Sequence, residues 1–84
     1  MTYRAVVNVM LKPQLLDTAG RTLQEALARM GMEAIERVRM GKRLELTIDA
    51  SDAAQAQELV QKACDELFVN SIIEVGNFEL EEVK

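Results

Sequence analysis

Hydrophobic residues alternate with polar ones along the first part of the chain, which is the pattern of a β-strand. The strand is predicted over residues 3–12, and one of its faces carries Tyr3, Ala5, Val7, Val9 and Leu11. Val6 and Met10 make the opposite face partly apolar as well, which favours a central position in a sheet. Pro13 then ends the strand.

Apolar side chains that recur every three or four residues predict two helices. The first begins after Asp17, whose carboxylate can accept amide hydrogens of the first turn, and ends at Gly31, which tolerates a left-handed backbone. Its apolar stripe consists of Ala19, Leu23, Ala26, Leu27 and Met30. The second helix opens at Ser51 and Asp52, and its stripe consists of Ala56, Leu59, Val60, Ala63, Cys64, Leu67 and Phe68. We expect its larger members to be buried in the core, at about 1.5 to 3 kcal/mol each.

Three further segments predict strands. Residues 34–40 are rich in branched and charged side chains, and Gly41 with Lys42 separates them from an alternating segment around Leu46, so we expect an antiparallel pair joined by a tight turn. Residues 71–83 contain a second alternation, with a bend at Gly76. The predicted order is β-α-β-β-α-β. We therefore expect an α+β two-layer sandwich, ferredoxin-like, with both helices on one face of an antiparallel sheet.

The composition is that of one globular domain over residues 1–84, with 49% hydrophobic and 29% charged residues. So small a domain buries only about 60% of its unfolded surface, which favours self-association. The chain contains no apolar run of membrane-spanning length and no signal-peptide pattern at its start, so we expect a cytoplasmic protein without membrane contact. The net charge of −4 gives no general attraction to nucleic acid.

Groups for catalysis and metal binding are scarce. Histidine is absent, and the single cysteine, Cys64, lies in an apolar stripe, so we interpret it as a core residue. Glu79 and Glu81 alternate outward as solubilising edge residues do. The four glycines fit neither a P-loop nor a dinucleotide-binding spacing. We therefore expect no catalytic residue, no metal site and no bound cofactor in this chain.

Four cations surround the predicted turn at Gly41, namely Arg37, Arg39, Lys42 and Arg43. They are compatible with a solvated hairpin without function, with nucleic-acid binding, or with docking to an acidic or phosphate-bearing partner. The lack of exposed aromatic residues on the strands disfavours nucleic acid. Met32 and Met40 flank turns and are further interface candidates.

Three motifs follow one another at characteristic spacings. Leu16-Asp17 with Gly20 opens the first helix, Val38-Arg39-Met40-Gly41-Lys42 leads into Leu44-Glu45-Leu46, and Asn70-Ser71-Ile72-Ile73-Glu74 follows the second helix. Together with the chain length and the opening strand, they resemble the PurS family over essentially the whole chain. PurS proteins are the small subunits of bacterial phosphoribosylformylglycinamidine synthase.

The resemblance implies a non-catalytic subunit of an ATP- and glutamine-dependent ligase in the fourth step of purine biosynthesis. In that family a glutaminase subunit (PurQ) releases ammonia, and a synthetase subunit (PurL) uses ATP and magnesium to form the amidine. The small subunit, typically a homodimer, bridges the two. A free-standing ligand-binding regulatory module of the ACT type is the alternative, although residues 12–16 lack the glycine-rich loop usual in such sensors.

The resemblance also implies which residues form interfaces. They are Arg39, Gly41 and Lys42, then Asp17 and Gly20, and then Asn70, Ile73 and Glu74. Asp17 and Gly20 have capping and close packing as alternative roles, and Asn70 could simply end the second helix in a left-handed conformation.

Overall fold

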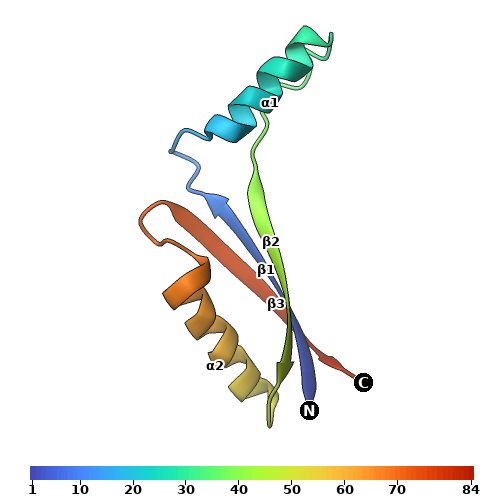
Figure 1. The fold of residues 1–84 in the computed structure, drawn as a ribbon, viewed down its shortest axis with the longest axis vertical. Coiled ribbons are helices and arrows are strands. Elements are labelled where there is room, and N and C mark those ends of the chain that lie inside the picture. Colours follow the sequence, from blue (N-terminus) through green and yellow to red (C-terminus); the bar gives the residue numbers. More distant parts are fainter.

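The computed structural model describes residues 1–84 as a sheet with two helices. The strands are β1 (Thr2–Leu11), β2 (Gly41–Asp49) and β3 (Glu74–Val83). The helices are α1 (Thr18–Arg29) and α2 (Ala53–Ala63), and a π-helical turn, η1 (Cys64–Phe68), continues α2. Figure 1 shows α2 beside the sheet and α1 beyond its end. The expected α+β class, with an antiparallel sheet and two helices, is confirmed.

β1 is the central strand, as expected, with β2 and β3 antiparallel on its two sides. Val7 lies opposite Leu44 on one side and Phe78 on the other, so the apolar residues of all three strands share one face. On this inner face Val60 of α2 and Cys64 of η1 join the core with the β1 residues Ala5, Val7 and Val9. The last strand therefore pairs within its own chain.

The strand expected over residues 34–40 is wrong. These residues form an irregular connection, and Gly41 and Lys42, expected in a turn, are the first residues of β2. The outer edge of β2 is free, but Gly41 and Lys42 pair with Met10 and Val9 of β1, so the chain makes no turn there that would lay residues 34–40 along that edge. Because an extended segment needs a neighbouring strand to satisfy its backbone, residues 34–40 form none. The observed order is β-α-β-α-β.

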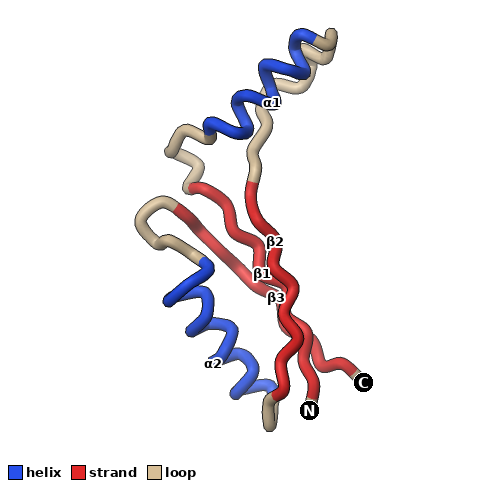
Figure 2. The backbone as a smooth tube through the Cα atoms, in the orientation of Figure 1, coloured by secondary structure: helices blue, strands red, loops and turns tan.

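Only α2 covers the sheet, and the expectation that α1 lies on the same face is wrong. Because β1 and β2 are adjacent and antiparallel, the chain between them only needs to turn back and does not cross the sheet. Residues 12–40, hereafter the arm, extend past the ends of the strands (Figure 2). The molecule consequently measures 52 × 30 × 13 Å.

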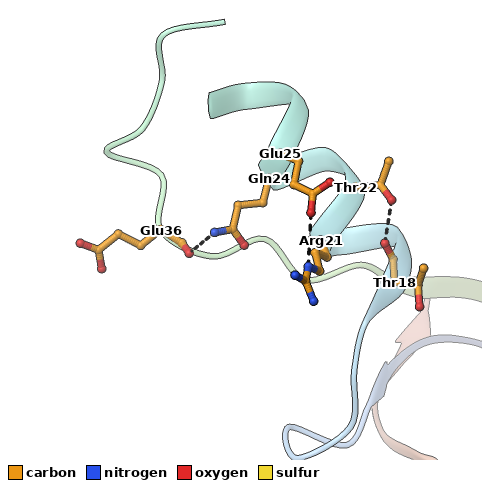
Figure 3. A network of polar contacts seen from close by, with 6 residues as sticks. All are labelled: Thr18, Arg21, Thr22, Gln24, Glu25 and Glu36. Carbon is orange, nitrogen blue, oxygen red and sulfur yellow. Dashed lines mark hydrogen bonds and ion pairs between the residues drawn. The ribbon is translucent and has the colours of Figure 1, made fainter. Parts of the chain in front are cut away.

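The arm is held together by its own hydrogen bonds. The side-chain amide of Gln24 donates to the carbonyl oxygen of Glu36 at 2.6 Å, so the returning segment follows α1 (Figure 3). Arg21 and Glu25 form an ion pair one turn apart on the helix, at 3.3 Å. Gly31 has φ of 86°, which confirms the left-handed residue expected at the end of this helix.

The apolar stripe of the second helix breaks at the π turn. The amide of Val69 donates to the carbonyl oxygen of Cys64 at 3.0 Å, a bond that spans five residues and not four. The extra residue changes the phase of the side chains, so Leu67 is 78% exposed while Val60 is fully buried. The expected burial of Leu67 is therefore wrong, as is that of Leu59, which is 46% exposed.

Candidate subunit interface

All three sequence motifs meet at one end of the sheet, where β1 ends and β2 and β3 begin. A hollow of about 240 Å³ opens there, lined by Val9, Leu11, Asp17, Ala19, Met40, Gly41, Lys42 and Glu74. Four of the eight predicted interface residues line it, and the other four are joined to the same end by backbone packing or hydrogen bonds. A larger hollow of about 270 Å³, between Arg4 and Glu81 on the open face of the sheet, contains none of the eight.

Asp17 joins the start of α1 to the residue before β2. Its Oδ1 accepts a hydrogen bond from the amide of Gly20 at 2.8 Å, and its Oδ2 accepts one from the amide of Met40 at 2.7 Å. The Gly20 amide, and after it the Met40 amide, lowers the pKa of the Asp17 carboxyl. The predicted capping role of Asp17 is thereby confirmed, with a second, longer-range bond that the sequence pattern did not show.

Gly20 is required for close packing at the base of the arm. It is the buried residue of α1, and a Cβ atom there would collide with the carbonyl oxygen of Val38. A larger side chain would push the returning segment off the helix. The close-packing role is confirmed, while a direct interface role for Asp17 and Gly20 stays a prediction.

Acid is expected to loosen the base of the arm. Because folding lowers the pKa of Asp17, its carboxylate stabilises the fold fully above its unfolded pKa of about 3.9, and this contribution is lost as the pH falls through the lower, folded-state pKa. As the pH falls below about 3.9, hydrogen-exchange protection of the Gly20 and Met40 amides should therefore decrease.

The Asp17→Ala variant should show the same loss without acid. Protection of the Gly20 and Met40 amides should be about five- to tenfold lower than in wild type already at neutral pH. Asp49→Ala, at an exposed carboxylate, is the control, and unchanged protection in Asp17→Ala would contradict the assignment.

Gly41 and Lys42 lie within β2, so the turn predicted among the four cations is wrong, and the cations make separate contacts. Arg39 donates from its guanidinium to the carbonyl oxygen of Leu11, and Arg37 donates to that of Pro13 at 3.4 Å. Successive strand residues point to opposite faces, so Lys42 and Arg43 separate. Arg43 pairs with Glu45 at 3.2 Å on the open face of the sheet.

Lys42 instead links the two outer strands across the end of β1. Its Nζ lies 3.6 Å from Oε2 of Glu74, whose side chain is only 16% exposed against 61% for Lys42. The other oxygen of Glu74 accepts from the amide of Asn70 at 2.8 Å. Glu74 is therefore engaged within the chain, and Lys42 has room for a partner.

The third motif forms a compact turn attached to β1. The carbonyl oxygen of Asn70 accepts from the amides of Ile73 and Glu74 at 3.0 and 2.7 Å, and the amide of Lys12 donates to Ile73 at 2.9 Å. No non-glycine residue has a positive φ, so the left-handed cap considered for Asn70 is wrong. The turn presents Ile72, which is 79% exposed, at its tip.

The eight predicted residues therefore divide into two groups. Asp17, Gly20, Arg39 and Glu74 are used inside the chain as a framework, and Gly41 starts β2 where a Cβ would collide with Met10 and Val9. Lys42, Asn70 and Ile73 are exposed, and so are two apolar side chains that the sequence analysis did not name as interface candidates, Ile72 in the same turn as Asn70 and Leu67 in the π turn before it. We call this group the turn surface, and it consists of Lys42, Leu67, Asn70, Ile72 and Ile73. The sequence carried no signal for Leu67, since its spacing matched a buried stripe.

Outside this end of the sheet, the structure contains no group of side chains arranged to bind a metal ion, and its single cysteine is buried. Cys64 is buried, as expected of a core residue, and burial, followed by the nearby Asp65 carboxylate, raises the pKa of its thiol. No three carboxylate, cysteine or histidine side chains lie close enough together to hold a metal ion. Neither helix has the length and apolarity needed to cross a membrane.

Comparison with known proteins identifies relatives along nearly the whole chain. The family model described as PurS, phosphoribosylformylglycinamidine (FGAM) synthase, matches residues 4–82. The PurS subunit of Bacillus subtilis is 41% identical over 81 residues, which cover 96% of this chain and 95% of the relative. The PurS subunit of Synechocystis is 38% identical, with coverage of 94% and 79%.

Solved structures give the same result. The structure of Bacillus subtilis PurS superimposes with a TM-score of 0.86 at 40% identity, over 95% of this chain and 99% of that one. A chain in the structure of PurLQS from Thermotoga maritima superimposes with a TM-score of 0.83 at 28% identity, over 99% of both chains. The sequence resemblance is confirmed, and this chain belongs to the PurS family of phosphoribosylformylglycinamidine synthase subunits.

Proposed function

We propose that this chain is the bridging, non-catalytic subunit of phosphoribosylformylglycinamidine synthase, in contact with both the glutaminase PurQ and the synthetase PurL. The observation that carries the proposal is the family match over residues 4–82. The Thermotoga maritima PurLQS structure, which contains a chain of this fold, supports the choice of partners. In this role the protein acts in cytoplasmic purine biosynthesis, while the larger subunits use ATP, magnesium and glutamine.

The arrangement at the end of the sheet suits a scaffold. Asp17, Arg39 and Glu74 direct their polar groups into the chain and fix the positions of three segments that are far apart in sequence. The turn surface is left exposed on this fixed base. Ammonia escapes or is protonated unless the site that releases it is held in register with the site that consumes it, and a rigid bridging subunit can hold them so.

The turn surface is the part of this chain that we propose contacts a larger subunit. Ile72 and Leu67 are 79% and 78% exposed, and large apolar side chains in such positions are typical of docking sites. Lys42, at the start of β2 and paired with Glu74 of β3, adds a charged group with 61% of its side chain exposed. The ligand-sensor alternative gains no support, because the connection after β1 contains Pro13 and no glycine before Gly20.

Assembly of purified subunits tests the proposal. Sedimentation velocity should show PurQ, PurL and this chain moving as one complex in the presence of glutamine and Mg-ATP. Without this chain, PurQ and PurL should sediment separately. A PurQ–PurL complex of unchanged stability in its absence would contradict the bridging role.

A further inference from the structure

The turn between η1 and β3 is closed by hydrogen bonds from both of its ends. Oε1 of Glu74 accepts from the amide of Asn70 at 2.8 Å, and the carbonyl oxygen of Asn70 accepts from the amide of Glu74 at 2.7 Å. Oδ1 of Asn70 also accepts from the amide of Ile72, at 3.1 Å. The two side chains therefore hold the ends and the tip of the turn together, and we call the bonds made by the Asn70 and Glu74 side chains the clamp.

The two ends of the turn are fixed on the sheet. On the β3 side, the Glu74 side chain is only 16% exposed, and its second oxygen lies 3.6 Å from Nζ of Lys42. On the η1 side, the side chain of Val69 lies so close to Gly76 of β3 that a Cβ atom there would collide with it. The glycine thus lets the chain before the turn lie directly on the sheet, and the clamp is built on a rigid base.

The tip of the turn depends on the clamp. Ile72 is 79% exposed, so its side chain packs little against its own chain. The only hydrogen bond that the structure gives Ile72 is the one from its amide to Oδ1 of Asn70. A loop without such bonds must be ordered when a partner binds, and a loop held beforehand in the binding conformation avoids that entropic cost.

We propose that Asn70 and Glu74 are positioning residues, which hold the turn in its binding conformation before a larger subunit docks. The inference rests on the proposed function, because the turn surface is the proposed contact. A partner that fits only the closed turn binds with an apparent affinity proportional to the fraction of chains in which the turn is closed. Glu74 therefore controls assembly through Ile72, without a contact of its own to the partner.

Hydrogen exchange on the chain alone tests the clamp. Glu74→Ala removes the acceptor for the Asn70 amide, and Glu74→Asp keeps the charge on a side chain one methylene shorter. Glu74→Gln keeps an oxygen in place and loses only the ion pair with Lys42. Protection of the Asn70 and Ile72 amides should fall at least about tenfold in the alanine and aspartate variants and stay within about twofold of wild type in Glu74→Gln.

The exchange of core amides serves as the internal control. The amide of Val7, in the central strand, should exchange at the wild-type rate in every variant that is folded, and Glu74→Asp provides the test if Glu74→Ala is not. Equal protection of the Asn70 and Ile72 amides in wild type and in the two shortened variants would show that the clamp does not hold the turn.

Binding kinetics test the effect of the clamp on assembly. The chain is labelled at its N-terminus, at the opposite end of the sheet from the turn (Figure 1), and mixed with PurQ and PurL in a stopped-flow fluorimeter. Glu74→Ala and Glu74→Asp should associate about tenfold more slowly than wild type and dissociate at the wild-type rate, because fewer chains are competent to bind but the bound contacts are the same. Glu74→Gln should associate at the wild-type rate, as should Glu79→Ala, the control on the open face of β3.

The pattern of rates distinguishes positioning from the other roles of Glu74. Faster dissociation with unchanged association would mean that Glu74 contacts the partner directly, and slow association of Glu74→Gln would assign the effect to the ion pair with Lys42. Either result, or wild-type rates in all variants, would overturn the proposal while leaving the bridging role intact. A wild-type chain that binds neither PurQ nor PurL would overturn the proposed function, and this inference with it.

Discussion

Replacing Val60 with alanine is expected to lower the free energy of unfolding by about 2 to 3 kcal/mol. Val60 is fully buried between α2 and the inner face of β1, so the change removes two methyl groups and leaves a cavity. An 84-residue domain has only about 5 to 10 kcal/mol of stability to lose. Urea denaturation at fixed protein concentration measures the loss.

Leu67→Ala is the matched control for Val60→Ala. Both positions belong to the stripe that the sequence pattern predicts, but the π turn leaves Leu67 78% exposed. Its replacement should change the free energy of unfolding by less than about 0.5 kcal/mol. A cost for Leu67→Ala equal to that for Val60→Ala would mean that α2 continues as a regular helix in solution.

Replacing Ile72 with glutamate is expected to weaken assembly with the larger subunits at least roughly tenfold while leaving the fold unchanged. Ile72 is 79% exposed at the tip of the Asn70–Glu74 turn, so its own chain loses little packing. A carboxylate desolvated in a partner's apolar pocket costs far more than one in water. Titration of labelled chain with PurQ and PurL, followed by fluorescence anisotropy, measures the affinity.

Gln57→Glu serves as the control for Ile72→Glu. It adds the same charge on the exposed side of α2, away from the turn surface. We expect its affinity for the larger subunits to equal that of wild type. Equal affinities for both variants would remove the turn surface from the proposed interface.

Much of the fold follows from local patterns. The alternation around Val7 predicted the central strand, and Asp17 and Gly31 marked the ends of the first helix, because these signals depend on a few neighbouring residues. The connection over residues 34–40 was not predictable in this way. Its composition is compatible with a strand, but whether it becomes one depends on whether the chain turns back at Gly41, and the pairing of Gly41 and Lys42 with β1 prevents that turn.

The position of α1 relative to the sheet also could not be predicted from local sequence patterns. Its stripe predicts that a surface will cover it, and the sequence gives no sign of whether that surface belongs to the same chain. Because β1 and β2 are adjacent and antiparallel, the arm that connects them extends past the end of the sheet, and α1 does not pack on the sheet of its own chain. The π turn that begins at Cys64 could not be predicted from local patterns either. The spacing of the apolar residues is that of a regular α-helix, but the extra residue in the π turn rotates the side chains that follow and leaves Leu67 exposed.

The site residues were predicted as a set, and their individual roles were not. Three motifs separated by up to 50 residues meet at one end of the sheet, as their common membership in a family pattern suggested. Their spacing did not show that Arg39 bonds to the end of β1 or that Glu74 is mostly buried. Those roles depend on contacts between β1, β2 and β3, which only the folded chain brings together.

The ratio of glutamine-dependent to ammonia-dependent synthase activity tests the account most directly. PurL and PurQ are assayed with formylglycinamide ribonucleotide and Mg-ATP, with and without this chain. We predict that the chain is required for turnover with glutamine and has little effect on turnover by PurL with added ammonia. Glutamine-dependent turnover that is the same with and without the chain would contradict the bridging role.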